Sequence, residues 1–63
     1  MTILTIAEAA EFLRMKPSNL YSMTRERGRA RMEKPIPVIR LNGSLRFAKE
    51  SLVEWLTDLE EKQ

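Results

Sequence analysis

The stretch LTIAEAAEFLRMKPSNLYSMTRERG, residues 4–28, holds two short helical patterns separated by a break of two or three residues. Thr5 followed by Glu8 is a capping box, in which a hydroxyl and a carboxylate satisfy the free N–H groups of a beginning helix. The apolar side chains recur at i, i+3, i+4 and i+7, and they are Ile6, Ala9, Ala10 and Leu13. We therefore predict a first helix over residues 6–14.

A second helix is predicted directly after the break, over residues 17–27. Pro17 suits the first position of a helix, and Gly28 is typical of a C-terminal end. The side chains predicted to share the inner face are Leu20, Met23, Thr24 and Arg27. So short a joint between two short helices favours a helix-turn-helix geometry, in which the helices cross at a steep angle.

Residues 36–47 carry a hairpin pattern, with two apolar runs on either side of the sequence Asn-Gly-Ser at 42–44. A two-residue loop would set charged side chains opposite apolar ones. A three-residue loop instead gives the cross-strand pairs Leu41–Leu45, Arg40–Arg46 and Ile39–Phe47. Because cross-strand partners share a face, we predict the three-residue loop, with a left-handed residue near Gly43 or Ser44.

A last helix is predicted from Ala48 or Lys49 to about Glu60, and residues 3–4 form a short strand or a hydrophobic staple. The expected fold is a small α+β winged helix-turn-helix, with a two-stranded hairpin wing and a C-terminal helix, in one domain over residues 1–63. The predicted core consists of Ile6, Ala10, Leu13, Leu20, Met23, Ile39, Leu41, Leu45, Phe47, Leu52, Trp55 and Leu56.

The composition excludes several classes of function. The 63 residues include no cysteine and no histidine, which excludes zinc fingers, thiolate metal sites and histidine-based triads. We therefore expect no enzymatic activity, no metal and no cofactor. The apolar runs are far shorter than the ~20 residues that cross a bilayer, and the N-terminus does not resemble a secretory signal. We expect a cytoplasmic protein of bacterial or phage origin without a membrane partner.

The charges are concentrated in the middle of the chain. Residues 14–49 carry ten basic side chains, and only Glu26 and Glu33 oppose them, so this segment has a net charge of +8. The flanking segments, residues 1–13 and 50–63, have net charges of −2 and −4. A concentrated basic segment indicates a polyanionic partner, although a solvated basic surface would show the same pattern.

The second predicted helix presents side chains that suit a DNA major groove. With Leu20 at the centre of its buried face, small hydroxyls, an amide and guanidinium groups lie outward or on the flanks. Ser18, Asn19 and Ser22 are the candidate base readers, since recognition helices meet bases near their N-terminal end. Arg25 could contact a base or a phosphate, and Arg29 follows on the same face. The alternative interpretation is that these side chains form an ordinary polar surface that binds no DNA.

Further basic residues are candidates for phosphate contacts, which position a protein without reading sequence. Arg40 and Arg46 are expected to project together from the hairpin toward a phosphate backbone or a narrow minor groove. The loop after the second helix adds Arg29 and Arg31, together with Arg27 and Lys34. Tyr21 either packs on the rim of the core or offers its hydroxyl to a phosphate.

The chain resembles the excisionase-type helix-turn-helix domains, which are small relatives of the MerR-like winged helices. The resemblance rests on LTIAEAAEFL at 4–13, Leu20-Tyr21, VIRLNGSLRF at 38–47, Leu52 and Trp55-Leu56. It implies a second helix in the major groove and a wing on the backbone or minor groove. Two features depart from the family. Lys16 replaces the usual serine cap, which implies either a looser start of the second helix or a lysine placed to meet a phosphate. The loop over residues 29–36 is longer than the common pattern.

Three functions fit these observations. The favoured one is an excisionase, or recombination directionality factor, which binds double-stranded DNA near attachment sites and steers an integrase toward excision. The integrase itself and further copies of the protein on adjacent sites are candidate partners. A small transcriptional regulator of the same fold is the alternative. A module that binds only an acidic protein is a third, and steep salt dependence of DNA binding would exclude it.

Overall fold

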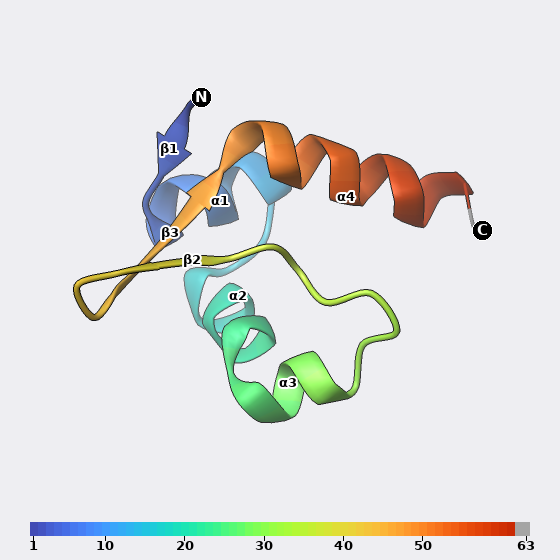
Figure 1. Ribbon diagram of the computed structural model, residues 1–63, viewed down its shortest axis with the longest axis horizontal. Helices are drawn as coiled ribbons and strands as arrows, with labels where there is room; N and C mark the ends of the chain where they lie inside the picture. Colours follow the sequence, from blue (N-terminus) through green and yellow to red (C-terminus); the bar gives the residue numbers. More distant parts are fainter. Residues whose placement is uncertain (62–63) are drawn as a thin grey trace.

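The computed structural model describes residues 1–61, which form four helices and a small antiparallel sheet with strand order β1-β3-β2 (Figure 1). The elements are β1 (Ile3–Leu4), α1 (Ile6–Leu13), α2 (Pro17–Thr24), α3 (Glu26–Ala30), β2 (Ile39–Leu41), β3 (Ser44–Ala48) and α4 (Lys49–Glu61). This is a small α+β winged helix-turn-helix, as predicted. The short strand at residues 3–4 pairs with β3, next to the hairpin.

The core lies where α1, α2, the base of the hairpin and α4 meet. The buried apolar side chains that pack together are Ala9, Ala10, Leu20, Ile36, Phe47, Leu52 and Trp55. Ile6, Leu13 and Met23 are partly buried and pack against this cluster, as predicted. Burying one large apolar side chain contributes roughly 1.5–3 kcal/mol, so these few residues supply much of the stability of so short a chain.

Two residues of the predicted core are exposed, and the predicted core left out three buried residues, Ala9, Ile36 and Ala48. Leu41 near the tip of the wing is 50% exposed, and Leu56 on α4 is 39% exposed. Both predictions are wrong, because the tip of the wing extends past the core and Leu56 lies at the edge of the buried stripe of α4. Ile36, between two prolines, is fully buried instead.

Trp55 fixes the segment that leads from α3 to the hairpin. Its indole is 8% exposed, and Nε1–H donates a hydrogen bond to the Lys34 carbonyl oxygen at 2.9 Å. The Lys34 ammonium also forms an ion pair with Asp58 on α4. Both side chains of that pair are partly exposed, so it stabilises the fold little compared with burial of the indole.

The joint between α1 and α2 consists of residues 14–16, as the break in the sequence predicted. Arg14 has a φ of 57°, and its N–H donates to the Glu11 carbonyl while the N–H of Met15 donates to the Ala10 carbonyl. These two bonds form a Schellman motif, which ends α1 and turns the chain sharply toward α2. Arginine here takes a left-handed conformation that glycine adopts more easily.

The prediction of one continuous helix over residues 17–27 is wrong. α2 ends at Thr24, whose hydroxyl donates to the Tyr21 carbonyl at 2.7 Å, and Arg25 is extended with a ψ of 153°. A separate short helix, α3, then begins at Glu26 and includes Gly28, which therefore does not end a helix. The break changes the direction of the chain, so periodicity counted through Arg25 gives the wrong phase for every later residue.

Gly28 allows α3 to lie directly against the end of α2. A Cβ atom added at Gly28 would lie 2.2 Å from the Ser22 carbonyl oxygen, far inside any van der Waals contact. The added Cβ atom and the Ser22 carbonyl oxygen are both bonded directly to the main chain, so no side-chain rotation separates them. Only a shift of α3 could relieve the clash. The contact between Gly28 and Ser22 therefore fixes the distance between the two helices.

The predicted hairpin register is also wrong. The structure pairs Ile39 with Arg46, Arg40 with Leu45 and Leu41 with Ser44, which leaves a two-residue loop. Asn42 and Gly43 have φ values of 46° and 80°, as a type I′ turn requires. The turn preference of Asn-Gly decides the register, because little apolar surface is buried at the exposed tip that could oppose it.

We predict that Gly28→Ala destabilises the protein by about 1–3 kcal/mol, the usual cost of overpacking. At an open helical position the same change would stabilise by roughly 0.5–1 kcal/mol, since alanine is the better helix former. Urea denaturation of the wild type and the variant measures the difference.

The matched control is Ala30→Gly, the reverse change at an exposed position of the same helix. It should cost no more than about 1 kcal/mol, through helix propensity alone. A Gly28→Ala protein as stable as the wild type would contradict the close seating of α3 on α2.

Candidate nucleic-acid interface

The outward face of α2 carries the side chains predicted to read DNA bases. Ser18, Asn19 and Ser22 are all exposed. The Ser22 hydroxyl donates to the Ser18 carbonyl at 3.1 Å, one turn earlier, and its lone pairs stay open to solvent. Pro17 and Ser18 have small side chains, so the first turn of α2 has a small diameter. The N-terminal half of α2 therefore presents small hydrogen-bonding groups that allow close approach to another surface.

Lys16 and Tyr21 flank this face. Lys16 precedes α2 without a side-chain capping bond, as expected for a residue that is a poor N-cap, and its side chain is exposed. Tyr21 is 51% exposed and does not join the core. The Arg25 guanidinium lies 6.0 Å from the centre of the Tyr21 ring, within reach of a cation–π contact. Tyr21 and Arg25 thus form one amphipathic edge beside α2.

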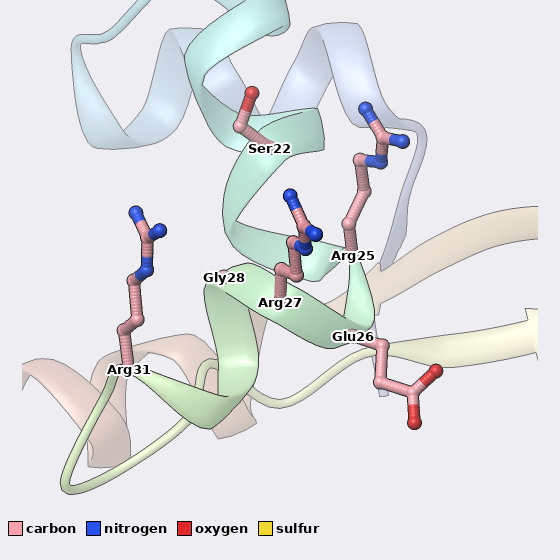
Figure 2. A pocket seen from close by; sticks show the side chains of 6 residues that line it. All are labelled: Ser22, Arg25, Glu26, Arg27, Gly28 and Arg31. Atoms are coloured by element: carbon pink, nitrogen blue, oxygen red, sulfur yellow. The ribbon is translucent and has the colours of Figure 1, made fainter.

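A hollow of about 490 Å³ lies between α2 and α3. We call it the arginine hollow, and it is lined by Ser22, Arg25, Glu26, Arg27, Gly28 and Arg31. Figure 2 shows the guanidinium groups of Arg25, Arg27 and Arg31 all directed along α2, whereas the Glu26 carboxylate points away from them. Within residues 1–61, no carboxylate forms an ion pair with any of these three arginines.

The spacing of the arginines explains this arrangement. Arg27 on α3 and Arg31 at its C-cap are four residues apart and share one side, whereas Arg29 lies about 200° around the helix from Arg27. The Arg29 guanidinium points inward, where Nη1 donates to the carbonyl oxygen of buried Ile36 at 2.6 Å. The prediction that Arg29 continues the outward face of α2 is therefore wrong, and the break at Arg25 is the reason.

The two hairpin arginines do not project together, which corrects a second prediction. Arg40 pairs with Leu45 and Arg46 with Ile39, so the two side chains leave the hairpin from opposite faces. Arg40 Nη2 reaches the carbonyl oxygen of Thr24 at 3.5 Å, at the C-terminal end of α2. Arg46 Nη1 donates to the Leu45 carbonyl at 2.8 Å. The observed register avoids the repulsion of directly opposed like charges.

The structure thus brings part of the predicted site together. Ser22, Arg25 and Arg31 meet in the arginine hollow, with Lys16, Ser18, Asn19 and Tyr21 along the same helix. Arg27, predicted to face inward, is exposed and lines the hollow. The spacing of four residues between Arg27 and Arg31 could have indicated that the two side chains share one side of a helix. The prediction of one continuous helix over residues 17–27 instead turned Arg27 inward. Arg29, Arg40 and Arg46 stand outside the hollow.

Neither a metal-binding group of side chains nor a membrane-spanning helix is found among the described residues. Among residues 1–61, no group of three or more acidic side chains could hold a metal ion. In the same range, no helix is long and apolar enough to cross a membrane.

Glu8 and Thr5 cap the start of α1. Its carboxylate accepts a hydrogen bond from the Thr5 backbone N–H at 2.9 Å, and the Thr5 hydroxyl accepts one from the Glu8 N–H at 3.2 Å. The backbone N–H of Thr5 is the main cause that lowers the pKa of Glu8 below its ordinary value of 4.5. The Thr5 hydroxyl and the positive charge of Arg46 lower this pKa further.

We predict that the advantage of the wild type over Glu8→Gln disappears in acid. Because the folded pKa of Glu8 lies below the unfolded value of 4.5, its contribution is complete above that pH and is lost as the pH falls through the lower folded value. Glutamine keeps the capping geometry without titrating. Thermal unfolding of both proteins between pH 7 and pH 3 measures the difference, and a constant difference would contradict the lowered pKa of Glu8.

Comparison with known proteins agrees with this architecture. No curated protein and no solved structure matches the chain. A family described as a helix-turn-helix domain matches residues 3–59, from β1 almost to the end of α4. The match includes the turn between α1 and α2, the wing and the helix that packs behind them. The chain belongs to the helix-turn-helix domain family, whose fold is built for binding DNA.

Proposed function

We propose that the protein is a sequence-specific binder of double-stranded DNA that acts as an excisionase. It would bind near attachment sites and promote excision by an integrase. Membership of the helix-turn-helix family supports DNA binding. The observation that carries the proposal is the exposed face of α2, with small hydrogen-bonding side chains toward its N-terminal end and, at its C-terminal end, three arginines that form no ion pair with a carboxylate within residues 1–61.

In this proposal α2 enters the major groove with its N-terminal end foremost. Asn19 is the candidate for bidentate hydrogen bonds to adenine, and the hydroxyls of Ser18 and Ser22 can donate to or accept from any base. Lys16, directly before α2, would meet a phosphate at the edge of the groove. Base contacts specify the sequence, and phosphate contacts hold the helix in place.

The wing contributes backbone contacts on one side of α2. Arg46 and Arg40 leave the hairpin from opposite faces, so they would reach different phosphates rather than one narrow groove. Arg40 lies against the end of α2, which ties the wing to the helix that reads the bases. Both contacts would be independent of sequence.

One small module of this kind binds DNA weakly, so partners would add to its affinity. Copies on adjacent sites, or contact with an integrase, raise the effective concentration without any new base contact. The acidic helix α4 lies across the molecule from α3 (Figure 1). We place it facing away from the duplex, where its carboxylates would meet a basic neighbour.

We predict that Asn19→Ala and Arg46→Ala weaken DNA binding in different ways. Asn19→Ala should remove about 1–3 kcal/mol of discrimination at one base pair, and therefore relax the sequence preference. Arg46→Ala should weaken binding to all duplexes about equally and reduce the salt dependence. Electrophoretic shift assays with DNA from beside the gene, and with scrambled duplex, measure both effects.

Lys49→Gln serves as the control, because Lys49 begins α4 and its ammonium lies over the Phe12 ring, away from the proposed interface. It should bind like the wild type. Wild-type protein that shows no preference among duplexes, and no loss of affinity with salt, would overturn the proposal and favour a protein partner.

A further inference from the structure

The arginine hollow has the chemistry of a phosphate site. Three guanidinium groups from the segment over residues 25–31 point the same way, and the carboxylate of Glu26, the acidic residue of the lining, points away (Figure 2). Like charges so arranged repel one another unless an anion neutralises them. Guanidinium groups match the oxygens of a phosphate in geometry and form short, charge-assisted hydrogen bonds to it.

The hollow is held in a fixed position relative to α2. Gly28 lies against the Ser22 carbonyl, so α3 cannot slide along the helix that carries the candidate base readers. On its inner side, α3 is tied by the bond from Arg29 to the Ile36 carbonyl. Arg27 on α3 and Arg31 at its C-cap are therefore held by a short helix anchored at two points, rather than by a free loop.

The length of α2 indicates which group fills the hollow. Its eight residues span about 12 Å, which is close to the width of the major groove. When the N-terminal end of α2 meets base edges, its C-terminal end emerges near the sugar-phosphate backbone. The hollow lies at that C-terminal end, since Ser22 and Arg25 contribute to its lining.

We propose that the arginine hollow binds a backbone phosphate of double-stranded DNA at the edge of the groove entered by α2, with Arg27 and Arg31 as the principal contacts. This assignment rests on the proposed function. It makes α3, which the sequence did not predict, a second DNA-binding element. The phosphate contact would set how deeply α2 enters the groove and would read no sequence itself.

The test compares Arg27→Gln and Arg31→Gln, singly and together, with Lys49→Gln, which also removes one positive charge. Binding of one duplex is measured by fluorescence anisotropy across a salt series. Each lost phosphate contact should lower the slope of log affinity against log salt by about 0.9, so the affinity lost between 50 and 200 mM salt shrinks by about 3.5-fold. The Lys49→Gln slope should equal that of the wild type.

A second arm replaces single phosphates of the duplex with neutral methylphosphonates. The wild type should lose affinity at one position beside the α2 site, and the Arg27→Gln/Arg31→Gln protein should be insensitive at that position alone, as expected for a coupled pair. A double variant that keeps the wild-type slope and stays sensitive at every position would overturn the phosphate assignment and leave the proposed function intact. Wild-type protein that binds no duplex would overturn both.

Discussion

Burial of Phe47 is the interaction on which the arrangement of the whole chain depends. Phe47 is fully buried on β3, which pairs with β1 on one side and with β2 on the other. β3 also runs without a break into α4, whose Leu52 and Trp55 complete the same core. A chain of this length buries few large side chains, so the position of α2 relative to the wing rests on this one cluster.

Elements with a continuous buried face could be predicted from the sequence. The helices α1 and α4 carry apolar side chains at helical spacing, and α1 and α2 also begin with a capping box and a proline. Burial of that stripe fixes the rotation of each helix, so Ala10, Leu20, Leu52 and Trp55 lie where the pattern placed them. The outward position of Ser18 and Asn19 follows from the same geometry.

Elements with little buried surface could not be predicted in this way. The tip of the wing takes its register from the positive φ values of Asn42 and Gly43, and no apolar face opposes that choice. The path after Thr24 depends on contacts of Gly28 and on burial of Ile36, which involve surfaces formed only after folding. The charge count thus predicted a basic surface. Which arginines form that surface depends on the break between α2 and α3 at Arg25, which the sequence pattern did not predict.

The indole of Trp55 gives the protein an optical reporter of its own. It is the only tryptophan in the chain, and its N–H is bonded to the segment that joins α3 to the hairpin. Separation of that segment from α4 would expose the ring to water and shift its fluorescence to longer wavelength. Nucleic acid does not emit in this range, so the same signal can follow the region behind α3 in a mixture with duplex, without a label.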